Sequence, residues 1–117
     1  MQLDHVALTV ADRERSAAFY AEHFGLTDRI HDDDHLLVLG QRGGGALLAL
    51  TEGEVPALPR TNHFGFRLGE GEAVRGARDR FREAGVPEAE WQDGGGMVRV
   101  QVLDPDGYRI DVYAYRP

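Results

Sequence analysis

The chain has 117 residues, of which 42% are hydrophobic and 28% are charged, a balance typical of one globular domain and not of a disordered chain. Its 13 basic residues, all of them arginine, stand against 20 acidic ones, and the net charge of −7 argues against nucleic acid as a partner. Cysteine is absent, which excludes disulfides, thiolate metal sites and a cysteine nucleophile. Small molecules are therefore the expected partners, and any metal must be held by nitrogen and oxygen.

No stretch of the sequence is apolar for the length of a membrane span. The N-terminus enters a strand-like pattern at once, without a basic segment followed by an apolar leader. We therefore expect a cytoplasmic protein that has no membrane partner.

The first half of the chain predicts a strand, a helix and three further strands. Residues 3–10, LDHVALTV, alternate as a strand does, although they include His5. Residues 12–25, DRERSAAFYAEHFG, carry an apolar stripe at helical spacing, with Asp12 as the N-cap and Gly25 as the stop. Residues 26–53 predict three strands separated by an acidic turn and a glycine turn.

After a connector at about residues 54–60, the second half predicts the same order of elements. Residues 61–68, TNHFGFRL, form a strand and residues 71–85 a helix. Residues 88–92, EAEWQ, form a short strand, and residues 95–115 form a hairpin closed by a Pro-Asp-Gly turn.

The repeated order indicates an internal duplication. Residues 3–10 align with residues 61–68, so that His5 matches His63. The simplest organisation is a single domain made of one module at about residues 1–53 and a second at about residues 61–117.

Successive side chains of a strand point to opposite faces, which divides each predicted strand into two sets. One set is apolar and suits packing beneath the helices. In a flat, open sheet the other set would simply be solvated, whereas in a curled sheet it would line a cavity. The members of this second set are His5, His63, Arg67, Met97, Arg99, Gln101, Arg109, Asp111 and Tyr113.

Two histidines and one carboxylate in this set suggest a metal site. His5, His63 and Asp111 lie on separate strands and would leave positions open for a substrate on a divalent ion. A lone histidine on a strand is more often an ordinary hydrogen-bonded residue. The three residues together, two of them related by the repeat, favour the metal site.

Other features have more ordinary interpretations beside the functional ones. The acidic segment HDDDH at residues 31–35 is predicted to be a solvated hairpin turn, and the glycine runs at residues 43–45 and 94–96 to be turns or bulges. Arginines on the polar face would bind an anion or lie solvated at its rim, and Trp91 would form an aromatic wall, core or a dimer contact. The predicted substrate-binding residues are Arg67, Trp91, Met97, Arg99, Gln101, Arg109 and Tyr113.

Five segments, LDHVALTVAD, RSAAFYAEHFGL, GALLALTEG, TNHFGFRL and DPDGYRIDVY, resemble the vicinal oxygen chelate superfamily over essentially the whole chain. This group includes glyoxalase I, extradiol dioxygenases, fosfomycin-resistance thiol transferases and bleomycin-binding proteins. The resemblance implies an α+β fold in which two βαβββ modules form a curled mixed sheet, a cup, with helices on its outer face. It also implies a homodimer.

In this superfamily, metal ligands occupy the first and last strands of each module, and the matching residues are His5, Ala49, His63 and Asp111. Ala49 stands where glyoxalase I carries a liganding glutamate or glutamine, which argues against that isomerase chemistry. The other three residues match the three-ligand branch, with Asp111 in place of the usual glutamate.

Two functions follow as hypotheses from this resemblance. The first is an enzyme that uses Mn²⁺, Fe²⁺, Zn²⁺ or Ni²⁺ and acts on a small oxyanionic or bidentate oxygen substrate, as a lyase, isomerase, thiol transferase or dioxygenase. The alternative is a binding protein that sequesters a small molecule without turnover, as bleomycin-binding proteins do.

Overall fold

The computed structural model describes residues 1–116 and divides into two compact units, with the boundary between Ala57 and Leu58. This boundary falls within the connector expected at residues 54–60. Among the described residues, neither helix has the length and apolar character needed to cross a membrane.

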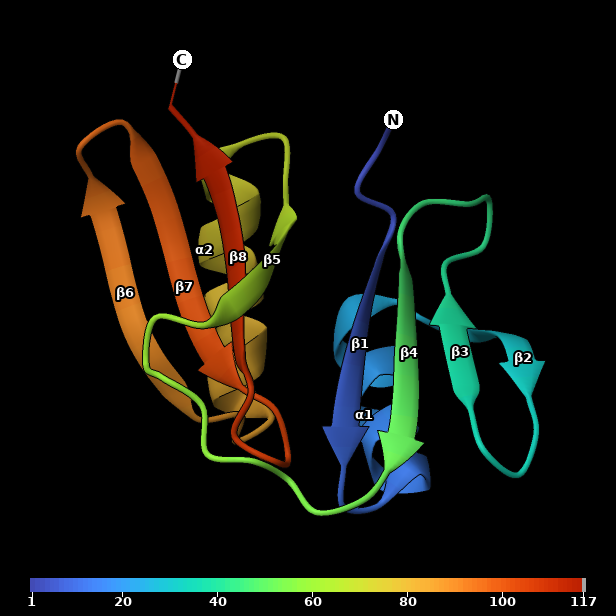
Figure 1. The fold of residues 1–117 in the computed structure, drawn as a ribbon. Coiled ribbons are helices and arrows are strands. Elements are labelled where there is room, and N and C mark those ends of the chain that lie inside the picture. Colours follow the sequence, from blue (N-terminus) through green and yellow to red (C-terminus); the bar gives the residue numbers. More distant parts are fainter. Residues whose placement is uncertain (117) are drawn as a thin grey trace. The chain divides into compact units, whose positions relative to one another are not determined.

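The first unit contains one helix and four strands (Figure 1): β1 (His5–Val10), α1 (Arg13–Phe24), β2 (Asp28–Asp32), β3 (Leu37–Gly40) and β4 (Leu47–Glu52). The strands form one open sheet in the order β1-β4-β3-β2. β1 runs parallel to β4, and the other pairs are antiparallel.

The second unit repeats this arrangement with β5 (His63–Arg67), α2 (Gly71–Glu83), β6 (Glu88–Gly94), β7 (Met97–Leu103) and β8 (Arg109–Tyr115). Its sheet has the order β5-β8-β7-β6, again with one parallel pair, β5 and β8. The predicted α+β fold of two βαβββ modules is confirmed, and each of the two sheets is open.

Local sequence signals set the boundaries of the elements. The Asp12 side chain accepts a hydrogen bond from the Arg15 amide at 3.0 Å and begins α1. The helix ends at Gly25, whose φ of 70° lies in the left-handed region that glycine adopts readily. In the Pro-Asp-Gly turn, Asp104 Oδ1 accepts from the amides of Asp106 and Tyr108, each at 2.9 Å, and so joins β7 to β8.

The core of each unit lies between its helix and one face of its sheet. The buried strand residues of the first unit include Leu8, Val10, Leu37, Leu39, Leu48 and Leu50. In the second unit, strand residues Val98, Val100, Val102, Ile110 and Val112 are buried together with Val74, Ala77 and Phe81 of α2. The alternation therefore assigned the apolar face of β1, β7 and β8 correctly, and it leaves the opposite face for polar side chains.

The two units also share their strand register. In the parallel pair of the first unit, Ala7 lies opposite Ala49, and in that of the second unit Gly65 lies opposite Asp111. Residues 7 and 65 are related by the same offset of 58 that relates the two histidines at the start of β1 and β5. Ala49 and Asp111 are therefore equivalent positions of a duplicated unit.

The acidic segment at residues 31–35 lies at the hairpin turn expected there: its first two residues end β2, and the turn to β3 begins at residue 33. Asp33 Oδ1 accepts from the amides of His35 at 2.8 Å and Leu36 at 2.9 Å, and Asp33 Oδ2 lies 2.7 Å from His31 Nε2. These hydrogen bonds, led by the one from the His35 amide, lower the pKa of Asp33 to about 2.

Candidate metal and substrate site

His63 and Asp111 are brought together on the polar face of the second sheet. His63 begins β5, and Asp111 lies on the adjacent parallel strand β8. Their side chains approach so that His63 Nε2 lies 3.3 Å from Asp111 Oδ2. The imidazole is 43% exposed and the carboxylate 11%, so the pair has one open side and one buried side.

The second nitrogen of His63 is fixed by the backbone. His63 Nδ1 lies 2.8 Å from the carbonyl oxygen of Thr61, and because a carbonyl can only accept, Nδ1 carries a proton. A ring that carries its proton on Nδ1 alone would offer the Nε2 lone pair to a metal ion, whereas a ring protonated on both nitrogens would form an ion pair with Asp111. A histidine ligand oriented in this way by a backbone carbonyl is a common arrangement at metal sites.

Asp111 is held from its other oxygen. Gln101 Nε2 donates to Asp111 Oδ1 at 2.9 Å, and Arg99 Nη1 donates to the same oxygen at 3.2 Å. Two donors on Oδ1 leave Oδ2 directed toward His63. Glycine at position 65 provides room for this strand, because a Cβ there would lie 3.0 Å from the Asp111 Cβ.

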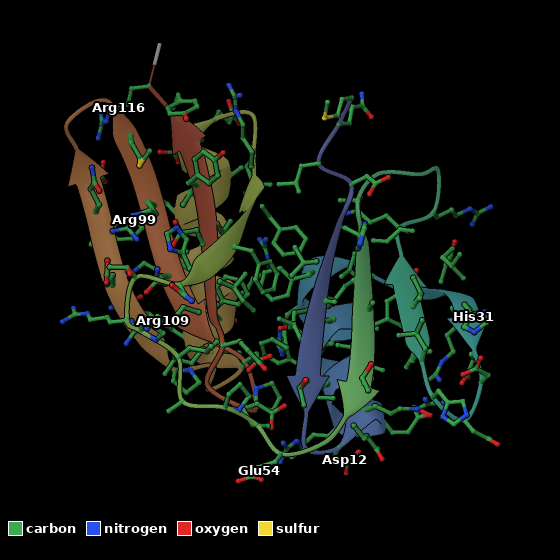
Figure 2. All side chains as sticks on the ribbon, in the orientation of Figure 1. Asp12, His31, Glu54, Arg99, Arg109 and Arg116 are labelled. Carbon is green, nitrogen blue, oxygen red and sulfur yellow. The ribbon has the colours of Figure 1, made fainter. Side chains whose placement is uncertain are left out.

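Polar and charged side chains surround this carboxylate, and Glu90 contacts the two arginines among them. Arg99 Nη2 donates to Glu90 Oε1 at 2.8 Å, while Arg109 Nη1 donates to Gln101 Oε1 at 2.9 Å and lies 3.9 Å from Glu90 Oε2. The hydrogen bond from Arg99 lowers the pKa of Glu90, and the same bond raises the pKa of Arg99. Figure 2 shows both arginines along the second unit's sheet.

An open pocket of about 280 Å³ adjoins the pair. Among the side chains around it, the rings of Tyr113 and Tyr115 meet edge to face with centroids 5.6 Å apart. The pocket is lined by His63, Phe64, Gly65, Met97, Arg99, Asp111, Tyr113 and Tyr115. Five predicted site residues therefore share one pocket, and Gln101 and Arg109 support it from the side.

A model of the Glyoxalase/Bleomycin resistance protein/Dioxygenase superfamily matches residues 2–112. The chain belongs to this superfamily. A comparison with curated proteins found no match.

Solved structures share the fold of this superfamily member along its whole length. A possible glyoxalase from Bacillus cereus has 28% sequence identity and a TM-score of 0.80, with 96% of this chain and 97% of that chain covered. The fosfomycin resistance protein FosX from Listeria monocytogenes, complexed with Mn(II) and sulfate, has 20% identity and a TM-score of 0.82, covering 98% and 90%. A lactoylglutathione lyase from Agrobacterium tumefaciens has 21% identity and a TM-score of 0.77, covering 97% and 92%.

The first unit contributes different chemistry at the positions where the superfamily resemblance implies ligands. His5 lies at the start of β1 with its side chain 66% exposed, and its Nδ1 is 2.7 Å from Asp4 Oδ1. Ala49 offers no ligand, and its strand neighbours are Ala7 and Val38. Within residues 1–116, no three His, Asp or Glu side chains form a cluster arranged to hold a metal ion, the acidic turn included.

The His63–Asp111 pair nevertheless fits two positions of a divalent ion. Two donors that each lie about 2.0–2.1 Å from one ion, at tetrahedral to octahedral angles, are about 2.9–3.4 Å apart. The observed separation of 3.3 Å between Nε2 and Oδ2 falls within that interval. The nitrogen and oxygen donors suit the transition metals named from the sequence.

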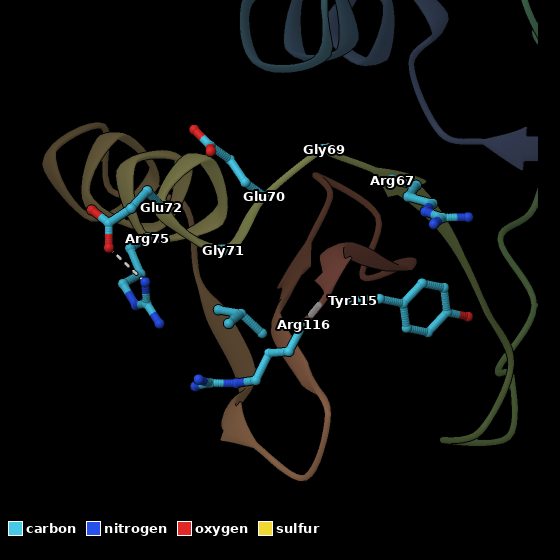
Figure 3. A pocket seen from close by; sticks show the side chains of 9 residues that line it. Arg67, Gly69, Glu70, Gly71, Glu72, Arg75, Tyr115 and Arg116 are labelled. Carbon is cyan, nitrogen blue, oxygen red and sulfur yellow. Dashed lines mark hydrogen bonds and ion pairs between the residues drawn. The ribbon is translucent and has the colours of Figure 1, made fainter.

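Arg67 lies on the same polar face but lines a second pocket of about 670 Å³ near the start of α2 (Figure 3). Its guanidinium carbon lies 4.7 Å from the ring centroid of Tyr115, a residue that lines both pockets. The other arginines here have acidic partners: Arg75 pairs with Glu72 at 2.6 Å and with Asp93 at 3.1 Å, and Arg116 with Asp93.

Trp91 is not brought together with the other predicted residues. It lies opposite Val100, which is buried on the helix side of the sheet, and Arg78 of α2 stacks over its indole at 4.0 Å. The side chain therefore lies on the face opposite His63 and Asp111, where it cannot form a wall of the pocket. Glu90, one residue earlier, lies opposite Gln101 and contacts Arg99, which lines the pocket. Sequence reasoning missed Glu90, and the only signal for it was that neighbouring strand residues point to opposite faces.

Proposed function

We propose that this chain is a divalent-metal-dependent enzyme in which His63 and Asp111 are two of the metal ligands. The observation that carries the proposal is the approach of His63 Nε2 to Asp111 Oδ2 at 3.3 Å, with His63 Nδ1 and Asp111 Oδ1 both engaged elsewhere. Each side chain thus directs its remaining donor toward the same point. Such a pair, on rigid neighbouring strands, is pre-organised for a cation.

The third ligand in this proposal is His5, which the superfamily resemblance assigns. The proposal requires His5 to reach the same ion, either from its own chain or from a second copy. We also propose the homodimer that the superfamily resemblance implies, for which light scattering after size-exclusion chromatography is the direct measurement. If the protein binds metal as a monomer, the His5 ligand must come from the same chain as His63 and Asp111.

The proposed substrate is a small molecule with one anionic oxygen or two neighbouring oxygens. A bound divalent ion would stabilise negative charge that develops on such an oxygen. The chain's own residues orient the substrate: Arg99 borders the pocket, and the Tyr113 and Tyr115 rings shape it. FosX from Listeria monocytogenes was solved with Mn(II) and sulfate, so Mn²⁺ and oxyanions are the first probes to use.

The reaction belongs to the lyase, isomerase, thiol-transferase or dioxygenase types known in the superfamily. Ala49 argues against the glyoxalase I isomerisation, because a methyl group neither binds a metal nor moves a proton. The side chain of Asp111 is one methylene shorter than glutamate, and Gly65 lets its strand approach β5 closely. This combination would maintain ligation by the shorter acid.

The alternative is a protein that sequesters a planar small molecule without turnover. Two features support it: the tyrosine pair along the pocket, which offers a ring for stacking, and the alanine at position 49. In this case ligand binding would be independent of metal.

Metal content separates the two functions. We expect about one equivalent of a transition metal by elemental mass spectrometry on protein purified without an affinity tag, and its loss in His63→Ala. His35→Ala is the matched control, because only the backbone amide of His35 takes part in the acidic turn. A wild-type protein that cannot be loaded with Mn²⁺, Fe²⁺, Zn²⁺ or Ni²⁺, yet binds ligands in chelator, would favour sequestration.

A further inference from the structure

We infer that Glu90 is a positioning residue that keeps Arg99 from covering the metal-binding oxygen of Asp111. This inference rests on the proposed function, since it concerns the ligand that Asp111 provides there. Glu90 itself does not contact His63 or the Asp111 carboxylate in the network, and it acts through Arg99.

The geometry of Arg99 carries the argument. Its Nη2 donates to Glu90 Oε1 at 2.8 Å and its Nη1 to Asp111 Oδ1 at 3.2 Å, so one guanidinium is divided between two carboxylates. An arginine beside a single carboxylate usually takes both oxygens through two parallel hydrogen bonds. Here the shorter hydrogen bond joins Nη2 to Glu90, so only Nη1 of Arg99 contacts Asp111.

The rest of the network keeps the same oxygen of Asp111 occupied. Gln101 donates to Oδ1 at 2.9 Å, and its amide orientation is fixed because its own oxygen accepts from Arg109 at 2.9 Å. Arg109 lies 3.9 Å from Glu90 Oε2. Glu90 Oε1 therefore binds Arg99 directly, whereas Glu90 Oε2 lies in ion-pair range of two arginines, Arg60 at 3.6 Å and Arg109 at 3.9 Å.

Loss of the Glu90 charge should release Arg99 toward Asp111. Arg99 is half-buried, and a guanidinium in that setting requires a carboxylate partner. With Glu90 neutral, the nearest remaining carboxylate is Asp111. Two hydrogen bonds from Arg99 to both oxygens of Asp111 would then occupy Oδ2. The consequence for the proposed site is competition between an arginine and a cation for one oxygen.

The experiment is a titration with Mn²⁺ alone by isothermal calorimetry. We expect Glu90→Gln to weaken Mn²⁺ binding by about 10- to 100-fold, the usual effect of losing a group that orients a metal ligand. The matched control is Glu88→Gln on the same strand, whose carboxylate pairs with Arg78 of α2 at 2.8 Å, and it should bind Mn²⁺ like the wild type. Thermal unfolding of both variants accounts for any general loss of stability.

The double variant Glu90→Gln with Arg99→Gln distinguishes positioning from a structural role. If Arg99 is the competitor, its removal should restore most of the lost Mn²⁺ affinity, whereas further damage to a structural network would lower it again. Equal affinity of Glu90→Gln and the wild type, or no recovery in the double variant, would overturn the inference.

A metal-free measurement keeps this test independent of the proposed function. In a crystal structure of metal-free Glu90→Gln, Arg99 should contact both oxygens of Asp111. If it still contacts Oδ1 alone, the positioning role is wrong whether or not the wild type binds metal. Failure of the wild type to bind any divalent ion, with Arg99 moved as expected, would refute the metal enzyme but not the role of Glu90.

Discussion

The two units have the same element order, strand order and register, but they present different chemistry on the equivalent face. In the first unit the central parallel pair places Ala7 beside Ala49, and in the second it places Gly65 beside Asp111. Around Asp111 a network of arginine, glutamine and glutamate side chains has formed, whereas the neighbours of Ala49 are small or apolar. A duplicated scaffold thus fixes where side chains can meet, while individual residues decide whether they form a polar site.

The first test of this difference between the units is Gly65→Ala, which gives β5 the residue that β1 has at the equivalent position, Ala7. The new Cβ would lie 3.0 Å from the Asp111 Cβ and 3.2 Å from its carbonyl oxygen. Overpacking of this kind costs about 1–3 kcal/mol, and about 0.5–1 kcal/mol of that is offset because alanine suits a strand better than glycine. We expect a net loss of about 1 kcal/mol in the free energy of unfolding, measured in urea, together with weaker Mn²⁺ binding.

The reciprocal change, Ala7→Gly, is the control for this prediction. It alters the equivalent strand position without touching Asp111, so it should lower stability by about 0.5–1 kcal/mol and leave Mn²⁺ affinity unchanged. Unaltered metal binding in Gly65→Ala would show that the close approach of β5 and β8 does not position the ligand.

Much of the fold was predictable because its signals are local. The Asp12 cap, the Gly25 stop, the Pro-Asp-Gly turn and the alternation of the strands each depend on a few neighbouring residues. The same alternation placed His63 and Asp111 on one face, and their proximity followed once β5 and β8 were adjacent.

The parts that sequence reasoning missed depend on contacts between strands. The pairing of β6 with β7 shifts between Glu88 and Glu90, so that Glu88 lies opposite Val102 and Glu90 opposite Gln101. Strict alternation would have placed these two glutamates on the same face. Likewise, the division of Arg99 between Glu90 and Asp111 is a matter of side-chain distances that no spacing along the chain determines. The position of His5 relative to the second unit's pair stays a prediction for the same reason.

A second prediction sharpens the contrast between the two faces of the second sheet. Trp91→Phe should lower stability by less than about 1 kcal/mol, since part of the interaction with the Arg78 guanidinium is retained by a smaller ring. Mn²⁺ and oxyanion binding should be unchanged, because Trp91 lies on the helix side. Tyr113→Phe, on the pocket side, is the comparison variant and should alter oxyanion binding; an effect of Trp91→Phe on binding would contradict the assigned face.

The smallest expected effect concerns Asp33 in the acidic turn of the first unit, whose carboxylate is held by two backbone amides and by His31. Because the pKa of Asp33 is lowered from 3.8 to about 2, the folded protein favours the ionised form. The resulting stability is present above pH 3.8 and is lost as the pH falls toward 2. Asp33→Asn, which resembles the protonated acid, should therefore unfold at a lower urea concentration than the wild type at pH 6, and the difference should vanish near pH 2.

Asp34→Asn, whose side chain holds neither of the amides bound by Asp33, is the control. A difference between Asp33→Asn and the wild type that persists unchanged to pH 2 would mean that the turn depends on the shape of the side chain and not on its charge.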